Sequence, residues 1–287
     1  MKLYVSFAAF TLAALAAPAL RSDLLVSTDW LAQHVSDAKV VILQVSANRT
    51  AYDAGHIPGA RFVALTELAT TRNGVPNELP EPAQLKKLFE AAGVSDDSRV
   101  ILVADSNVLA ATRAYFTLDY LGHGDKAALL DGGLSKWTAE NRTLSKDTPT
   151  PATGNLTLHA KPELVVSTDA VTDLTKRANP ASGAVLLDVR SAPEYRGEKG
   201  AHIPTALNAN WVDSQLSREN QALKPESDLR KLYEAAGLKG DRPVVTYCNS
   251  GMQASQSYFT LKYLGYDVKM YDGSLSEWNS KGGALEK

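Results

Sequence analysis

The chain has almost no cysteine: its 287 residues include one, Cys248. A single thiol excludes an internal disulfide framework, so the hydrophobic core must hold the fold together. The five histidines are scattered, and none stands beside the cysteine at a metal-ligand spacing. We therefore expect no metal site and no cofactor.

An excess of charge of one sign is also lacking, because the formal net charge is −2. Proteins that bind nucleic acid or an anionic membrane surface usually carry a basic patch or a basic excess. The near balance of charges gives no support for either kind of partner, and we expect none.

Long apolar runs are absent except at the N-terminus. Met1-Lys2 is followed by the almost wholly apolar residues 3–16 and by the small-residue pattern Ala17-Pro18-Ala19. This order predicts a secretory signal peptide over residues 1–19, rather than an N-terminal helix or an anchor. The apolar run is short for a membrane span, so we expect no stable span in the mature chain and export, in a bacterium to the periplasm. A lone thiol is unusual in an oxidising compartment, which favours a chemical use for it.

The rest of the chain is long enough for two domains and repeats itself. Short segments recur in the same order in both halves. The pairs are Val26–Asp29 with Val166–Asp169, His56–Pro58 with His202–Pro204, Glu90–Gly93 with Glu234–Gly237, Tyr115–Leu118 with Tyr258–Leu261, and Asp131–Trp137 with Asp272–Trp278. We expect a first domain over residues 22–142, a Thr-, Pro- and Ser-rich linker over 143–162, and a second domain over 163–287.

Within each half, short β-branched or apolar runs alternate with segments of helical periodicity. This alternation predicts an α/β fold in which a mostly parallel central sheet is covered by helices on both faces. The expected strands are Val40–Val45, Val100–Ala104, Ala127–Leu130 and Pro243–Thr246, and the expected helices are Pro82–Gly93, Ala110–Gly122 and Ala254–Gly265.

The single cysteine lies between a predicted strand and a predicted helix. The carboxyl ends of parallel strands are where ligands bind in such sheets, and the unpaired N–H groups of a helix start favour anions. We expect this environment to make the Cys248 thiol ionise more readily, and Gly251 to take a positive φ that turns the loop amides inward. The alternative is a buried structural cysteine. The expected binding loop consists of Asn249, Ser250, Gly251, Met252, Gln253 and Ala254.

The duplication allows the two halves to be compared. Aligning the shared Tyr-Phe-Thr-Leu segments places Asp105 opposite Cys248 and Val108 opposite Gly251. The first half therefore cannot perform thiol chemistry, and we expect it to form one wall of a site between the domains. The alternative reading makes Asp105 a catalytic acid, but no partner base is evident.

The tandem organisation, the His-Ile-Pro turns, the Asp-Gly-Gly/Ser…Trp closures, Leu187-Asp188-Val189-Arg190 and the cysteine loop together resemble the two-domain rhodaneses, which are thiosulfate or 3-mercaptopyruvate sulfurtransferases. The resemblance covers nearly the whole chain after the signal peptide. It implies a catalytic second domain, a Cys248 persulfide intermediate, a small anionic sulfur donor and a thiophilic acceptor such as cyanide or a thiol. Thiosulfate is the expected donor. The alternatives are 3-mercaptopyruvate, and a non-catalytic sulfur carrier or redox-binding module.

Some positions depart from the family pattern, which leaves the donor open. Glu194 stands where vertebrate-type members have a second substrate arginine. Arg190 is expected to pair with a carboxylate and hold the loop, or to contact substrate, and Arg196 and Lys199 are further candidates to meet an anionic donor. Ala254 stands where cysteine phosphatases have an arginine, and a phosphate dianion would lack that bidentate clamp.

The remaining aromatic and histidine residues are assigned mainly to the structure. His56 and His202 are expected to hydrogen-bond within turns, and Trp137 and Trp278, which occupy equivalent places in the two halves, are expected in the cores. Trp211 is a candidate to line the site.

Overall fold

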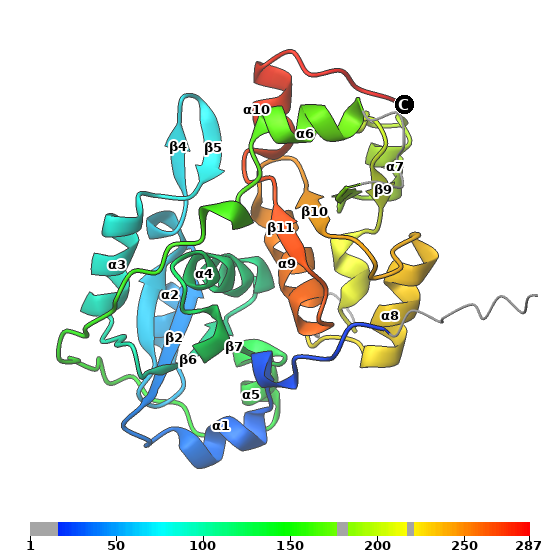
Figure 1. The fold of residues 1–287 in the computed structure, drawn as a ribbon. Coiled ribbons are helices and arrows are strands. Elements are labelled where there is room, and N and C mark those ends of the chain that lie inside the picture. Colours follow the sequence, from blue (N-terminus) through cyan, green and yellow to red (C-terminus); the bar gives the residue numbers. More distant parts are fainter. Residues whose placement is uncertain (1–16, 177–182, 217–220) are drawn as a thin grey trace, which may run out of the picture.

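The computed structural model describes residues 17–176, 183–216 and 221–287 of the chain (Figure 1). Residues 1–16, which hold the apolar run of the expected signal peptide, lie outside this part. In the described residues, no helix combines the length and the apolar character needed to cross a membrane.

The first half of the chain alternates strands with helices as the periodicity predicts. Ser27 caps the first α-helix, its hydroxyl accepting a hydrogen bond from the amide of Trp30 at 3.1 Å. The elements are η1 Ser22–Leu24, β1 Leu25–Val26, α1 Thr28–His34, β2 Val40–Ser46, α2 Thr50–Ala54, β3 Arg61–Ala64, η2 Leu65–Glu67, β4 Thr70–Arg72, β5 Val75–Glu78, α3 Pro82–Ala91, β6 Arg99–Ala104, α4 Val108–Tyr120, η3 Gly124–Lys126, β7 Ala127–Leu130 and α5 Gly133–Ala139.

The second half repeats this order. Ser167 caps its first α-helix as Ser27 does in the first half. The elements are η4 Pro162–Leu164, α6 Thr168–Thr175, β8 Val185–Asp188, α7 Ala192–Tyr195, β9 Leu207–Asn208, η5 Trp211–Ser214, α8 Glu226–Ala235, β10 Val244–Tyr247, α9 Met252–Tyr263, β11 Val268–Met270 and α10 Ser274–Ser280.

Each half contains a parallel sheet. The strand order is β1-β7-β6-β2-β3 in the first sheet and β11-β10-β8-β9 in the second. An isolated parallel bridge between Val165 and Met270 occupies the place that β1 has in the first half. Helices cover both faces of each sheet, which confirms the predicted α/β class.

Successive strand residues alternate between the two covered faces. On β2, Leu43 joins the cluster beneath α3 and α4, and Ile42 joins the cluster beneath α1 and α5. In the second half, α6 and α10 cover one face and α8 and α9 the other. One cluster continues through α4 and α9 from the first sheet to the second, so the two halves share a hydrophobic core.

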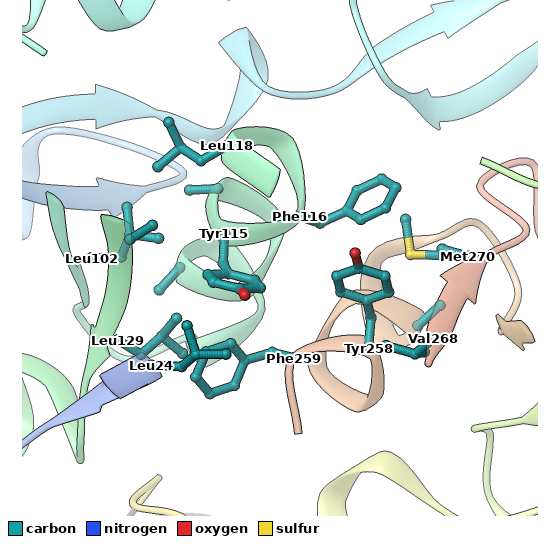
Figure 2. Packing of buried hydrophobic residues seen from close by; sticks show 14 of the residues in the cluster. Leu24, Leu102, Tyr115, Phe116, Leu118, Leu129, Tyr258, Phe259, Val268 and Met270 are labelled. Atoms are coloured by element: carbon teal, nitrogen blue, oxygen red, sulfur yellow. The ribbon is translucent and has the colours of Figure 1, made fainter. Parts of the chain in front are cut away.

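Helices α4 and α9 pack against each other through equivalent residues of the two halves (Figure 2). Tyr115 meets Phe259 and Phe116 meets Tyr258, both edge-to-face at a ring separation of 4.9 Å. This reciprocal contact gives the two halves an approximate two-fold relationship at their centre.

A buried carboxylate fastens the same contact. Asp119 on α4 accepts a hydrogen bond from the Tyr258 hydroxyl at 2.7 Å and pairs with Lys161 and Lys262 at 3.0 and 3.1 Å. Burial alone would raise the pKa of Asp119, but Lys262, Tyr258 and Lys161 together lower it below the ordinary carboxyl range. Asp119 is therefore ionised at neutral pH, and its charge links the first half to Tyr258 and Lys262 of the second.

A hairpin that was not predicted from the sequence, β4–β5, projects from the first half towards α10 (Figure 1). Asn73 and Gly74 connect its strands, with φ values of 51° and 79°. The dipeptide Asn-Gly is the strongest short-range sequence signal for a hairpin, because both of its residues tolerate a positive φ. The hairpin could therefore have been predicted from the sequence.

The segment expected to be a linker lies along the first half. The amide of Gly154 donates to the carbonyl of Glu90, and that of Asp96 to the carbonyl of Asn155. Leu156 is buried in the shared core. The composition is typical of a linker, yet main-chain hydrogen bonds hold the segment in place; the proposed domain limits themselves stay a prediction.

Replacing Asp119 with Asn should destabilise the protein by about 3 kcal/mol at pH 7, because two lysines would lose the buried charge that compensates them. The folded-state pKa of Asp119 is lowered, so its contribution is present above the ordinary carboxyl pKa and is lost as the pH falls through the folded value. Urea unfolding at neutral and acidic pH measures the difference between the variant and the wild type.

The exposed Asp228, which pairs with Lys231 on the surface of α8, supplies the control. Asp228→Asn should change stability by less than about 1 kcal/mol. An equal loss in both variants would contradict the role of Asp119.

Candidate active site

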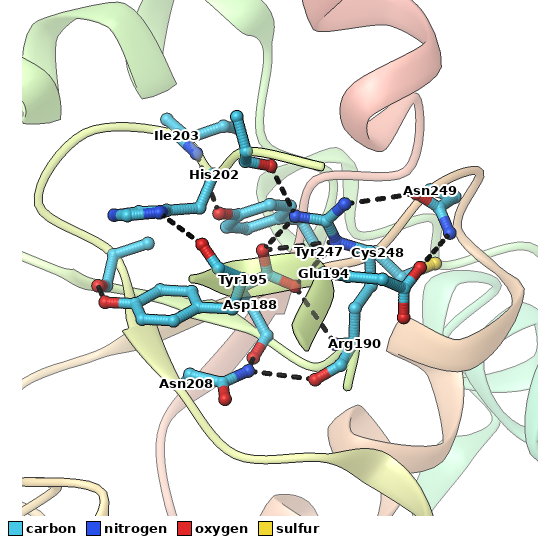
Figure 3. Close-up of polar contacts among 12 residues, drawn as sticks. Asp188, Arg190, Glu194, Tyr195, His202, Ile203, Asn208, Tyr247, Cys248 and Asn249 are labelled. Carbon is cyan, nitrogen blue, oxygen red and sulfur yellow. Dashed lines mark hydrogen bonds and ion pairs between the residues drawn. The ribbon is translucent and has the colours of Figure 1, made fainter. Parts of the chain in front are cut away.

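Cys248 directly follows β10 and precedes α9, at the carboxyl end of the second sheet (Figure 3). Its side chain is buried, with the residue 1% exposed. The predicted position at a strand-to-helix turn is confirmed.

The main chain of the loop forms a cradle around the thiol. The backbone amides of Ser250, Ala254, Gln253 and Gly251 lie close enough to the thiol to lower its pKa. Gly251 has the expected positive φ, 84°. These donors carry no net charge, so they can stabilise a sulfur anion without a cationic side chain.

The expectation that this thiol ionises more readily is wrong. Burial raises the pKa of Cys248 and outweighs the loop amides, which lower it, so the pKa lies above the ordinary value of a thiol. The reason is desolvation, which penalises a charge more than four neutral donors compensate. The resting thiol is therefore mainly protonated at neutral pH.

The first residue of helix α10, Ser274, holds the cysteine loop in place. The hydroxyl of Ser274 accepts hydrogen bonds from the amides of Cys248 and Gly251, both at 3.1 Å, and donates to the carbonyl of Tyr271 at 2.9 Å. Ser274 lies in the repeated Asp-Gly-Gly/Ser segment, so the repeat marked the region but not this role.

Arg190 holds the loop from the side (Figure 3). It is buried, donates to both carboxylate oxygens of Asp188 and to the carbonyl of Ala201, and reaches the side-chain oxygen of Asn249 at 3.4 Å. This is the carboxylate pairing that the sequence analysis expected, and it leaves little of the guanidinium for a substrate.

The other basic candidates lie elsewhere. Arg196 and Lys199 are exposed, beyond the end of α7. In the described part of the chain, neither side chain forms a hydrogen bond or ion pair, and neither lines the cavity described below. A role for Arg196 in substrate binding stays a prediction.

The first half reaches the cysteine loop through its hairpin. The side chain of Asn77 donates to the hydroxyl of Ser250 at 3.0 Å. The buried Arg113 of α4 binds Asp272, which also accepts a hydrogen bond from the amide of Leu79 at 2.8 Å. Sequence reasoning missed these contacts, because nothing in the chain's local pattern pairs Arg113 with Asp272.

A cavity of about 350 Å³ opens beside the loop, between the two halves. The first-half segment opposite the cysteine loop lines one side, and Trp211, a candidate from the sequence, lines another. Its lining residues are Ser106, Asn107, Val108, Ser191, Glu194, Asn210, Trp211, Val212, Gln215, Gln221 and Gln253.

The corresponding loop of the first half begins with an aspartate whose carboxylate accepts hydrogen bonds from the loop. Asp105, which follows β6 as Cys248 follows β10, accepts hydrogen bonds from the amides of Ser106 and Asn107 and from the hydroxyl of Ser46. A carboxylate thus occupies the place where the second half has a thiol.

The two histidines and two tryptophans have the structural positions expected of them. His56 and His202 hydrogen-bond to main-chain carbonyls. Trp137 and Trp278 are buried, and each indole donates to a carbonyl six residues later. Among the described residues, no group of three or more His, Cys, Asp or Glu side chains could hold a metal ion.

Comparison with known proteins agrees with the fold. The model of the rhodanese-like domain matches the chain twice, at residues 27–140 and 169–281. The sulfur carrier protein TtuD of Thermus thermophilus is 35% identical over 274 residues, which cover 90% of this chain and 94% of that protein. A putative thiosulfate sulfurtransferase of Saccharopolyspora erythraea is 34% identical over 276 residues, with 91% and 94% covered.

A solved structure shows the same arrangement. The crystal structure of the Escherichia coli 3-mercaptopyruvate sulfotransferase SseA matches with a TM-score of 0.76 at 28% identity, covering 88% of this chain and 98% of that one. Two α/β domains of this type in one chain define a sulfurtransferase of the rhodanese type. The chain belongs to the tandem-domain rhodanese family.

Gly251→Ala should destabilise the protein by more than the cost of left-handed backbone strain alone. An added Cβ would lie 2.7 Å from the carbonyl oxygen of Asp272, in a residue whose φ is +84°. We expect a loss of about 3 kcal/mol in unfolding free energy, from left-handed strain together with the clash. Denaturant titration measures it.

Gly282 provides a matched control, because its φ is +71° and nothing lies within 4 Å of an added Cβ. Gly282→Ala should cost about 1 kcal/mol from strain alone. Equal losses at the two positions would show that Asp272 does not confine the loop.

Proposed function

We propose that this chain transfers a sulfane sulfur from thiosulfate to a thiophilic acceptor, cyanide or a thiol, through a persulfide on Cys248. The observation that supports this most directly is the position of the single thiol, buried between the end of β10 and the start of α9 in a loop whose main-chain amides lower its pKa. A neutral cradle of this kind suits an intermediate in which negative charge develops on sulfur.

In the first half-reaction, the Cys248 thiolate attacks the outer sulfur of thiosulfate. The sulfur–sulfur bond of the donor breaks, its electron pair leaves with sulfite, and Cys248 carries a persulfide anion. Since burial keeps the resting thiol mainly protonated, the attacking thiolate is a minor species that the cradle stabilises as it forms. In the second half-reaction, the acceptor attacks the outer sulfur and the electron pair returns to Sγ.

3-Mercaptopyruvate is the second candidate donor. Asn249 and Ser250 are neutral, and among the described residues no cationic side chain lines the cavity. A dianion such as thiosulfate gains less from such a site than a donor with one negative charge. The likeness to the 3-mercaptopyruvate sulfotransferase SseA supports the same alternative.

A sulfur-carrier role is the third candidate and comes from a different class of function. A relative named as a sulfur carrier protein is 35% identical. A carrier would accept sulfur on Cys248 and deliver it to a partner protein. The cavity of about 350 Å³ beside the loop is of a size that suits a small acceptor, which favours turnover over a carrier role.

We also propose that the chain is exported after cleavage of residues 1–19, since a charged start, an apolar run and small residues follow one another there. N-terminal sequencing of the periplasmic protein should give Leu20 as the first residue. A chain that retains Met1 in the cytoplasm would contradict export.

Cys248→Ser should abolish the formation of thiocyanate from thiosulfate and cyanide without changing the unfolding midpoint, because a hydroxyl fills the same space but cannot accept sulfur. Wild-type protein treated with donor should gain the mass of one sulfur atom, located on Cys248. Kinetics with thiosulfate and 3-mercaptopyruvate side by side would identify the preferred donor.

Asp105→Asn is the matched control in the equivalent loop. It should leave sulfur uptake unchanged if the first half has no chemical role, whereas loss of activity would support Asp105 as a catalytic acid. Sulfur uptake without turnover for any small acceptor would favour the carrier role, and full activity of Cys248→Ser would overturn the site.

A further inference from the structure

The hairpin of the first half is tied to the cysteine loop by a single side chain. Asn77, on β5, donates from its side-chain amide to the hydroxyl of Ser250 at 3.0 Å. Ser250 follows Cys248 by two residues. Among the described residues, this is the one hydrogen bond that the Ser250 side chain forms, and the one that joins residues 249–254 to the first half. The position of Ser250 therefore depends on a residue of the other half.

The neighbours of Ser250 are held from within the second half. The amide of Gly251 donates to the hydroxyl of Ser274 at 3.1 Å. The carbonyl of Asn249 accepts hydrogen bonds from the amide and the hydroxyl of Ser276, at 2.9 and 2.8 Å. Helix α10 thus fixes the backbone on either side of Ser250, and the hairpin supplies the remaining contact.

The backbone around Asn77 is itself fixed. Its carbonyl accepts a hydrogen bond from the buried Arg113 at 2.6 Å, and the amide of Leu79 donates to the carboxylate of Asp272 at 2.8 Å. Asn77 has a φ of 62°, in the left-handed region that asparagine and glycine adopt more readily than other residues. The side chain therefore extends towards Ser250 from a backbone that is held on both sides.

Ser250 matters to the thiol through its main chain. Burial raises the pKa of Cys248, and among the loop amides that oppose this effect the amide of Ser250 does most. A hydrogen-bond donor stabilises a nearby anion only at short range and in good alignment, so a small displacement of this amide weakens its effect. A side chain that fixes Ser250 therefore acts on the thiol, although its own hydrogen bond does not go to the sulfur.

We propose that Asn77 is a positioning residue for the reaction: from the first half, it fixes Ser250 so that the Ser250 amide faces the sulfur of Cys248. The first half, which has no thiol, then contributes to the reactivity of the thiol in the second half as well as to the wall of the cavity. This inference rests on the proposed sulfur transfer and adds a residue to it.

A neutral replacement at Asn77 leaves the charges around the cysteine loop unchanged. A change in the titration of the thiol would therefore report the position of neutral donors rather than a new charge. The ionisable groups packed around the loop and the hairpin are Asp188, Arg190 and Glu194 on the side of the second sheet, and Glu78, Arg113 and Asp272 on the side of the hairpin.

Asn77→Gly removes the side chain and keeps the left-handed backbone without strain. Because the chain has one cysteine, labelling cysteine with ¹³C at Cβ gives one NMR signal, whose shift follows ionisation of the Cys248 thiol. We expect the titration to move to higher pH in the variant, with about threefold less thiolate at a fixed pH below the midpoint, as the weakening of one hydrogen bond allows. Sulfur loading from thiosulfate in a single turnover should slow by about the same factor.

Asn73→Gly is the matched control. Asn73 is exposed at the tip of the same hairpin and has a φ of 51°, and its side chain forms no hydrogen bond within the described residues. The control should titrate and load as the wild type does. The unfolding midpoints of the two variants should be similar, because each replaces asparagine with glycine at a positive φ. An unchanged titration in Asn77→Gly, or equal shifts in both variants, would overturn the inference.

A double-mutant cycle tests the route through Ser250. Ser250→Ala removes the acceptor and should reproduce the shift of Asn77→Gly, and the two changes together should give no larger shift than either alone, because they remove the same contact. Additive shifts would contradict the inference. The titration needs no sulfur donor, so the two proposals can fail separately. Failure of every donor to load the wild type would overturn the proposed function, whereas normal loading with an unchanged titration in Asn77→Gly overturns this inference alone.

Discussion

The contact between α4 and α9 is the constraint on which the site depends. Equivalent residues meet there, and Thr112 hydrogen-bonds Ser255, its counterpart in the other half, at 3.0 Å. A contact that is self-complementary places the start of each helix, and the loop before it, at the same boundary. The cysteine loop and its first-half counterpart therefore border one cavity, although 142 residues separate Asp105 from Cys248.

Two opposing electrostatic effects act on the thiol at that boundary. Burial disfavours the thiolate, and the loop amides favour it; the balance leaves the pKa of Cys248 raised. The loop amides therefore do not ionise the Cys248 thiol in the resting protein. The amide N–H groups are already in place for the negative charge that develops on sulfur during transfer. They can stabilise that charge without reorganising.

The sequence predicted the fold and the position of the thiol well, because both follow from local patterns. Strand runs, helix periodicity and the duplication locate β10, Cys248 and α9 to within two residues. The sign of the thiol pKa could not be predicted in this way, since it depends on how deeply the folded chain buries one atom. Arg113, Asp272 and Gln215 were missed for the same reason: their importance arises from segments brought together by α4 and α9.

The two halves show how one loop design has been used in two ways. In the first half, Asp105 supplies its own carboxylate to the loop amides, so the anion-binding position is permanently filled and the segment serves as a wall. In the second half, a neutral thiol leaves the amides available for a transient sulfur anion. Glu194 and Gln253 of the second half and Ser106 of the first line the same cavity, and the Gln221 amide donates to the carbonyl of Ser106 across it. The cavity therefore requires both halves.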